Sequence, residues 1–283
     1  MLFALLTSPF QVLRLAWVAY RSRYQGREQW EVFRVMTAFW LKINFPWAYP
    51  GVCRQRLFGF EVEGSSYKLL LQLFKEIFLT EPYAFEPNTA APLLIDGGAN
   101  IGMSVVYFKK HFPQARILAF EPSPDAFRLL TRNVAANNLA GVELHNVALA
   151  PTTGELPFYT EPDGATLNGS LRPYTAGIRT VRVPARRLAD YLPAATSIDL
   201  LKLDVEGAEP GILADLAQAG LLTRFRCVLV EYHYSVDTPE SSQLASCLQM
   251  FHDQGFAYYF KMVYPHTAHS QDIILHCWQP NHC

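Results

Sequence analysis

The stretch from Leu93 to Pro122 constrains the fold of this chain more than any other segment. A short apolar run ends at Asp96, a glycine-rich turn follows, and the next apolar run ends at Glu121. Between the two runs, a helical pattern covers about residues 101–111 and stops before Pro113. This order of strand, glycine turn, helix and strand is half of a nucleotide-binding βαβ unit, with Glu121 near the position of its ribose-binding acid. The segment therefore predicts a bound cofactor that contains adenosine.

The choice of cofactor depends on the charge at the glycine turn. Asp96 directly precedes the first glycine, where its carboxylate would repel a pyrophosphate lying about 4–6 Å away. S-adenosylmethionine (SAM) carries no phosphate. Its ammonium and sulfonium groups favour an acid at this place, and its carboxylate suits the amides of a helix N-terminus. We therefore predict SAM as the cofactor; the alternative is that Asp96 caps a helix in an unrelated α/β fold.

The predicted cofactor contacts come from the glycine turn and from residues that follow successive strands. They are Asp96, Gly97, Gly98, Ala99, Asn100, Gly102, Glu121, Pro122, Asn146, Val147, Ala148 and Asp204. Glu121 is expected to accept both ribose hydroxyls. Asn146 and the two residues after it are expected to border the adenine, because ligands of open α/β sheets lie outside the carboxyl ends of the strands. The alternative for Asn146 is a plain turn after a strand.

Beyond the glycine turn, apolar runs alternate with helical patterns, which predicts a mostly parallel sheet with helices on both faces. Strands are expected at 92–96, 116–121, 142–147, 198–204, 227–232, 256–261 and 272–278, and helices at 100–111, 124–138, 185–192, 209–219 and 239–254. The last two strands are expected to form a hairpin. The predicted fold is therefore α/β: a doubly wound, seven-stranded, Rossmann-like sheet of the class I methyltransferase type. The segment 151–182, rich in glycine and proline, is expected to be a functional loop or lid.

A second region precedes this α/β pattern. Helical patterns lie at 9–24 and 27–44, an alternating run typical of one edge strand at 56–63, and a further helical pattern at 66–78. We predict an N-terminal helical extension over residues 1–55 and a SAM-dependent methyltransferase domain over 56–283. Packing of the amphipathic extension on the domain or on a second copy is favoured, and it predicts a homo-oligomer. Contact of these helices with a membrane surface is the alternative.

The composition limits the partners and the compartment. Half of the residues are hydrophobic and the net charge is −1, so a substantial core is expected. No basic stripe is visible, which argues against a nucleic-acid partner. The five cysteines form no C-x-x-C pair. Neither a disulfide framework nor a zinc site is therefore predicted, and the pattern favours a reducing, cytoplasmic location.

Four sequence blocks resemble the FkbM-type methyltransferases. They are IDGGANIG (95–102), FEPSP (120–124), LKLDVEGAE (201–209) and VEYH (230–233), within a resemblance that covers roughly residues 57–262. The third block selects this family among SAM-binding folds. The resemblance implies a SAM-dependent O-methyltransferase that acts on a hydroxyl of a small molecule, sugar or glycan. Methylation of a DNA base amine is improbable, because Asp204-Val205-Glu206-Gly207 replaces the Asn/Asp-Pro-Pro-aromatic turn of those enzymes.

Acids and one histidine at the ends of the fourth and fifth strands form the predicted reactive group. These catalytic candidates are Asp204, Glu206, Glu231 and His233. Side chains two residues apart share one face of a strand, so the two sets can converge where the strands end side by side. We expect His233 or Asp204 to accept the proton of the acceptor hydroxyl, and Glu206 and Glu231 to hold the acceptor hydroxyls.

Two alternatives use the same residues. A divalent metal held by the carboxylates and the histidine would lower the pKa of the acceptor hydroxyl, but it is not favoured and no metal ligand is predicted. Otherwise, Glu209 starts a helix and Lys202 pairs with an acid in a structural ion network. Two further functions stay open: a nicotinamide-dependent oxidoreductase and a catalytically silent SAM-binding assembly subunit.

Overall fold

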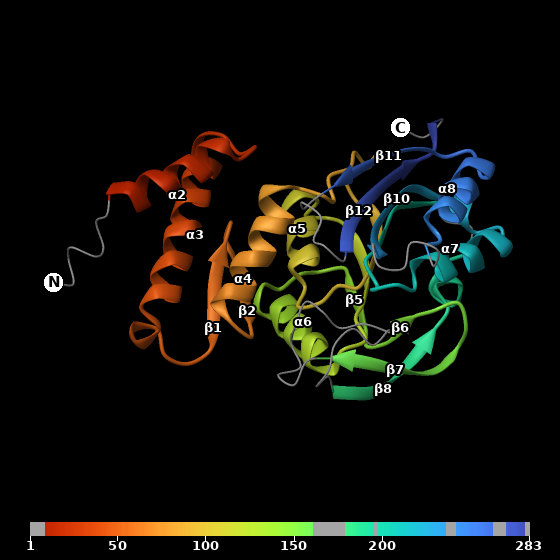
Figure 1. Cartoon of the computed structure of the whole chain (residues 1–283), viewed down its shortest axis with the longest axis horizontal. Coiled ribbons are helices and arrows are strands. Elements are labelled where there is room, and N and C mark those ends of the chain that lie inside the picture. The colour runs from red at the N-terminus through yellow and green to blue at the C-terminus, as the bar shows by residue number, and fades with distance from the viewer. Residues whose placement is uncertain (1–8, 161–178, 195–196, 236–241, 263–269, 281–283) are drawn as a thin grey trace. The chain divides into compact units, whose positions relative to one another are not determined.

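The computed structural model of the chain describes residues 9–160, 179–194, 197–235, 242–262 and 270–280. The chain divides into two compact units, Met1–Glu81 and Pro82–Cys283 (Figure 1). The domain boundary predicted between residues 55 and 56 falls inside the strand β1 (Cys53–Leu57) of the first unit, and the domain limits stay a prediction.

The first unit is built from helices and one β-hairpin. Its elements are α2 (Pro9–Arg21), α3 (Gly26–Asn44), the 3-10 turn η1 (Pro46–Ala48), β1, β2 (Phe60–Gly64), α4 (Tyr67–Leu73) and the π-helical turn η2 (Phe74–Leu79). Phe78 stacks on Phe58 and on Phe74, with ring centroids 5.6 and 5.7 Å apart. Among the described helices, none combines the length and the apolar character that crossing a bilayer requires.

The predicted single strand at 56–63 is wrong, because the structure contains a hairpin there. Phe58 and Gly59 have φ angles of 49° and 98°. Two successive residues with positive φ form the turn that suits a two-residue hairpin loop. The chain therefore reverses, and β1 pairs with β2 in antiparallel register.

The second unit contains a seven-stranded sheet in the order β11-β12-β10-β9-β3-β4-β5 (Figure 1). The strands are β3 (Leu93–Gly97), β4 (Arg116–Phe120), β5 (Val142–His145), β9 (Ile198–Leu203), β10 (Phe225–Ser235), β11 (Ala257–Met262) and β12 (Ser270–Trp278). The strands from β5 to β10 in this order are parallel, whereas β12 runs antiparallel to both of its neighbours. This topology confirms the predicted class I methyltransferase sheet with its terminal hairpin.

Helices of this unit follow the strands as the apolar patterns predict. They are α5 (Met103–His111), α6 (Pro124–Ala136), α7 (Glu209–Gln218) and α8 (Leu244–Asp253). Apolar side chains of β3, β4, β9 and β10 form one buried cluster with those of α7 and α8. Burial of this cluster fixes the strands whose ends carry the candidate site.

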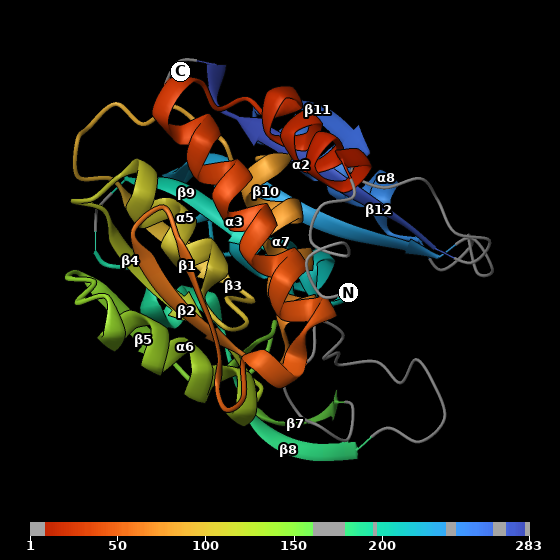
Figure 2. The same ribbon diagram turned by 90° about the vertical axis from the view of Figure 1, so that its left-hand side faces the viewer.

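A small third sheet replaces part of the predicted loop and of a predicted helix. β7 (Gly154–Thr160) pairs antiparallel with β8 (Arg179–Arg186), and β6 (Ala148–Leu149) runs parallel to β8. This sheet lies at the bottom of both views (Figures 1 and 2). The irregular segment predicted at 151–182 therefore has strands at both ends, while its residues 161–178 lie outside the described part.

The helix predicted at 185–192 is also wrong. The chain there finishes β8 and then forms only a 3-10 turn, η3 (Leu188–Tyr191). Val183 and Ala185 are buried, whereas Arg182 before them is exposed and Pro184 between them is only partly buried. This alternation is the period of a strand, and it outweighs the helical spacing of the residues that follow.

The parallel strands bring the candidate residues to one edge of the sheet. In the register, Gly97 pairs with Leu203, and Leu203 pairs with Val230. The next residues of these strands, among them Asp204 and Glu231, therefore lie at the same carboxyl edge. This is the edge at which open α/β sheets bind their ligands.

Candidate active site at the ends of β3, β4, β9 and β10

The glycine turn after β3 depends on backbone conformations that favour glycine. Gly98 and Gly102 have φ angles of 78° and 91°. The amides of Gly98 and Ala99 both donate to the carbonyl of Phe120 at the end of β4, at 3.0 and 2.9 Å. A Cβ on Gly98 would lie 1.8 Å from the carbonyl oxygen of Asp204. The turn is therefore pressed directly against the end of β9.

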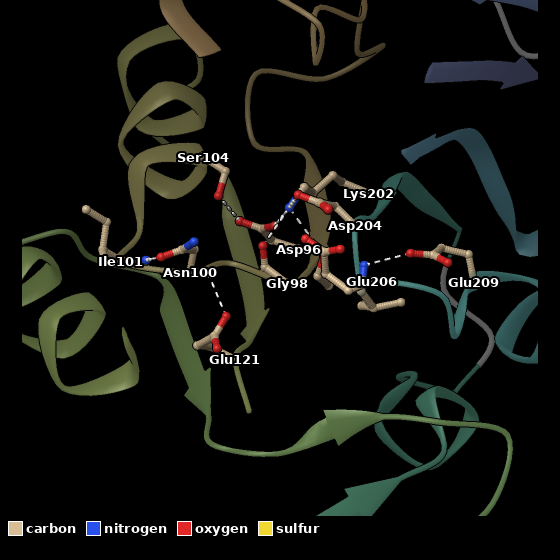
Figure 3. A network of polar contacts seen from close by, with 12 residues as sticks. Asp96, Gly98, Asn100, Ile101, Ser104, Glu121, Lys202, Asp204, Glu206 and Glu209 are labelled. Atoms are coloured by element: carbon tan, nitrogen blue, oxygen red, sulfur yellow. Dashed lines mark hydrogen bonds and ion pairs between the residues drawn. The ribbon is translucent and has the colours of Figure 1, made fainter. Parts of the chain in front are cut away.

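A buried ion pair joins the turn to β9 (Figure 3). The Asp96 side chain is 0% exposed; its Oδ2 accepts from Ser104 Oγ at 2.6 Å, and its Oδ1 lies 3.2 Å from Lys202 Nζ. Lys202 Nζ also donates to the Gly98 carbonyl at 2.6 Å and lies 3.4 Å from Asp204 Oδ2. Burial alone would lower the pKa of Lys202, but the neighbouring carboxylates of Asp96 and Asp204 outweigh it and raise this pKa.

The ion pair with Lys202 corrects the expectation from the sequence that Asp96 presents a free carboxylate to the cofactor. The Asp96 carboxylate does not face a cofactor as a free negative charge, because Lys202 neutralises it and Ser104 occupies its other oxygen. The residue instead fixes the turn to the neighbouring strand. Any negative field at the turn has to come from the other carboxylates of this edge.

Glu121 lies where the ribose-binding acid is predicted. Its Oε2 accepts a hydrogen bond from the backbone N–H of Asn100, and its Oε1 accepts one from the backbone N–H of Ser123, both at 2.8 Å. Burial raises the pKa of Glu121 to about 7, although these hydrogen bonds act in the opposite direction. Each carboxylate oxygen has a second lone pair, so Glu121 can still accept hydroxyl groups.

The three residues predicted at the adenine have unequal positions. Asn146 donates its side-chain amide to the carbonyls of Glu121 and Pro122, at 2.8 and 3.2 Å, and so holds the turn after β4. Val147 packs against the main apolar cluster, and Ala148 is buried in β6. Their contact with an adenine stays a prediction.

Three of the four predicted catalytic residues lie close together, and the fourth, Glu231, lies on β10 two residues before His233. One ligand atom each of Asp204, Glu206 and His233 lies within 4.8 Å of the others, and His233 Nε2 is 3.6 Å from Glu206 Oε2. The loop that carries Glu206 is held by Glu209, whose carboxylate accepts from the amides of Val205 and Gly207 at 2.9 Å. Glu206 itself has a φ of 56°. A non-glycine residue rarely adopts this left-handed conformation, which is often found at functional sites.

Burial and mutual repulsion raise the pKa values of two acids in this group. Burial raises the pKa of Glu206 to about 7, and that of Glu231 to about 8 with a further contribution from Asp204. Burial would lower the pKa of His233, but the carboxylates of Glu206 and Asp204 raise it to about 9. His233 therefore carries a proton at neutral pH when only these side chains surround it.

Two residues of this network escape the sequence analysis. Ser104, in the first turn of α5, reaches Asp96 because the glycine turn folds the helix start back over the strand end. That spacing is visible in the sequence. Asp272 lies opposite His233 in the β10–β12 pairing. The register of the hairpin is needed to place Asp272 beside His233, because no local sequence pattern indicates that the two residues are neighbours.

Comparisons with known proteins match the sequence to methyltransferases. Residues 96–258 match the family described as the methyltransferase FkbM domain. Methyltransferase 1 of Beauveria bassiana is 34% identical over 164 residues, which are 51% of this chain and 66% of that protein. Methyltransferase sdnD of Sordaria araneosa is 36% identical over 172 residues, 50% of this chain and 66% of that protein. The 2-O-methyltransferase NoeI of Sinorhizobium fredii is 31% identical over 157 residues, 50% of this chain and 63% of that protein. The chain thus matches just under two thirds of the length of each relative.

Proposed function

Because this chain belongs to the methyltransferase FkbM domain family, we propose that it transfers a methyl group from SAM to a hydroxyl of a small molecule, sugar or glycan. One relative is named a 2-O-methyltransferase, which supports oxygen as the acceptor atom. The family also argues against the nicotinamide-dependent oxidoreductase. A catalytically silent SAM-binding subunit is the alternative that an activity assay has to exclude.

One observation carries the proposal: the reactive residues lie directly beside the glycine turn. The Asp204 carbonyl approaches Gly98 so closely that a Cβ there would be 1.8 Å away. Lys202 Nζ contacts both the Gly98 carbonyl and the Asp204 carboxylate, at 2.6 and 3.4 Å. A reactive group held at this turn is therefore next to Asp204, and an acceptor held by Asp204 is next to the turn.

The residues around the turn fit SAM. Glu121 retains lone pairs for ribose hydroxyls, although it already accepts from two backbone amides. Asp204, Glu206 and Glu231 bring carboxyl groups to this edge, and a bound ammonium or sulfonium would favour the ionised form of Glu206 and Glu231, whose pKa values are raised to about 7 and 8 without it. Because Lys202 already balances the charge of Asp96, these groups would attract the positive charges of SAM, a role that the sequence predicts for Asp96.

SAM would supply, when bound, a methyl carbon that the acceptor oxygen attacks while the carbon–sulfur bond breaks and S-adenosylhomocysteine leaves. Asp204, Glu206 and Glu231 would hold the acceptor hydroxyl in line with that methyl group. Such orientation contributes on the order of 7–11 kcal/mol to catalysis. Asp204 is the favoured proton acceptor, because the raised pKa of His233 means that its ring already holds a proton near neutral pH. A positioned base adds roughly 10²–10⁴-fold to the rate.

The cofactor assignment is tested by binding. Calorimetry of the purified full chain is expected to show tight binding of S-adenosylhomocysteine (SAH) and none of NAD. Binding of NAD without SAH would contradict the proposal. The activity is tested by mass spectrometry of metabolites from cells with and without the gene, which should differ by one methylene mass. If SAH binds but no metabolite changes and no methyl group is transferred in a single-turnover assay, the protein is a silent subunit.

The catalytic residues are tested by substitution. Asp204→Ala and His233→Ala are each expected to lower turnover at least ~10²-fold, because a positioned group at the acceptor oxygen is lost. SAH affinity should stay within a few-fold for His233→Ala. His252→Ala, which changes an exposed histidine of α8, is the matched control and should keep full turnover. Wild-type turnover in both site variants would remove these two residues from the mechanism.

A further inference from the structure

We propose that Asp204, Glu206 and His233 bind one divalent cation of the Mn²⁺ class at the carboxyl edge of β9 and β10. In the metal-bound enzyme Asp204 would serve as a ligand instead of as the proton acceptor, and the role of the ion, to hold the acceptor hydroxyl and lower its pKa, rests on the proposed methyl transfer. The binding site itself rests on the side chains. The sequence alone does not favour a metal here; the positions of the side chains in the structure support it.

The geometry comes close to that of a coordination site. One donor atom of each residue lies within 4.8 Å of the other two, and Nε2 of His233 is 3.6 Å from Oε2 of Glu206. Ligand atoms bound to one ion at about 2.1 Å lie roughly 3–4 Å apart. Small side-chain rotations are therefore sufficient to close the three donors around an ion.

The donor set suits a transition metal ion and leaves room for a substrate. The two carboxylates are ligands of the kind that Mn²⁺ prefers, and the imidazole is a ligand that also binds iron and zinc. The three side chains are 24% to 28% exposed. They are therefore partly shielded from bulk water but still accessible to it. Three protein ligands with open positions are the arrangement of catalytic rather than structural metal sites.

A second observation concerns the nitrogen of His233 that faces away from Glu206. His233 Nδ1 is inaccessible to solvent and makes no hydrogen bond among the described residues. Its nearest charged neighbour is Glu209 Oε1 at 3.9 Å. A buried ring nitrogen without a hydrogen-bond partner destabilises the folded protein. The orientation of the His233 ring therefore calls for another interaction. With an ion on Nε2, the ring proton would lie on Nδ1, which faces the Glu209 carboxylate at 3.9 Å, and metal-bound histidines typically donate their second N–H to such an acid.

The surrounding charges also favour a cation. Asp272 lies opposite His233 in the strand register, and Glu209 at the start of α7 and Glu231 on β10 add two more carboxyl groups. The nearby ammonium of Lys202 is engaged by Asp96 and by the Gly98 carbonyl and lies 3.4 Å from Asp204 Oδ2, so it offsets part of the acidic charge. Acids therefore outnumber bases around Glu206, and a divalent ion would reduce their mutual repulsion. The competing occupant is a proton on His233.

The test is direct binding of Mn²⁺ to the full chain after dialysis against a chelator. The electron paramagnetic resonance signal of free Mn²⁺ is followed during titration, with and without SAH. One Mn²⁺ is expected to bind per chain, and Glu206→Gln is expected to weaken binding at least ~10-fold because a ligand is lost. His233→Gln should have a similar effect. Glu143→Gln, which changes an exposed acid paired with His145 at 3.1 Å, is the matched control and should bind as the wild type does.

Each outcome decides between the metal and the proton. Loss of binding in the two site variants, with unchanged folding by circular dichroism and unchanged binding in the control, supports the metal site. Undiminished free Mn²⁺ signal, or equal affinity in all variants, overturns it and leaves a protonated His233 as the occupant. SAH calorimetry on the same samples separates this result from a failure of the proposed function. SAH binding without Mn²⁺ binding refutes the metal alone, and absence of both refutes the two proposals.

Discussion

Replacing Gly98 by alanine is expected to lower SAH affinity at least ~100-fold and to destabilise the protein by roughly 2–5 kcal/mol. The added Cβ would lie 1.8 Å from the Asp204 carbonyl oxygen and 2.9 Å from its carbon. These are backbone atoms of a strand end and cannot rotate away as a side chain can. Either the turn or Asp204 must move, and both are placed at the proposed site. Calorimetry with SAH and urea unfolding measure the two effects.

Gly255→Ala separates the clash from the backbone strain. Gly255 has the same φ of 78°, but a Cβ there would meet nothing within 4 Å. A left-handed alanine alone costs about 1–2 kcal/mol, so this variant should lose a little stability and keep full SAH affinity. Wild-type SAH binding by Gly98→Ala, or equal losses in the two variants, would show that the contact with Asp204 does not shape the site.

Replacing Lys202 by methionine is expected to destabilise the protein by about 3–5 kcal/mol. Methionine keeps most of the side-chain volume but removes the ammonium. The Asp96 carboxylate, 0% exposed, then loses the cation 3.2 Å away. The Gly98 carbonyl loses its donor at the same time. Urea unfolding followed by circular dichroism measures the loss, and SAH calorimetry shows whether the glycine turn is also displaced.

Two further variants identify the buried charge as the cause. Lys109 is also buried, but it donates to the carbonyls of Ala115 and Ala140. Lys109→Met therefore leaves carbonyl groups rather than a carboxylate without their donor, and it should cost only about 1–3 kcal/mol. Adding Asp96→Asn to Lys202→Met removes the uncompensated charge and should recover part of the stability. An equal cost for both lysines, or no recovery in the double variant, would contradict this explanation.

The fold was largely predictable because its signals are local and periodic. The apolar runs that end at Asp96 and Glu121 lie in β3 and β4, and the helical patterns after them become α5 and α6. The errors also have local causes. Positive φ at Phe58 turns one predicted strand into a hairpin, and the alternation around Val183 belongs to a strand rather than to a helix.

The candidate site was predictable in its membership but not in its charges. Strand ends and alternation place Asp204, Glu206, Glu231 and His233 near one another, and the structure brings Asp204, Glu206 and His233 within 4.8 Å. The sequence pattern cannot show which acid is neutralised, because that depends on the direction in which the Lys202 side chain points.

The sequence by itself determined the order of the strands and helices, the glycine turn and the set of acids at the strand ends, because each depends on neighbouring residues along the chain. Only the tertiary structure decided that Lys202 neutralises Asp96 and that His233 faces Glu206. Electrostatic energy depends on distances of a few ångströms between side chains far apart in the sequence. Such distances exist only once the sheet register and the packing of the strand ends are fixed.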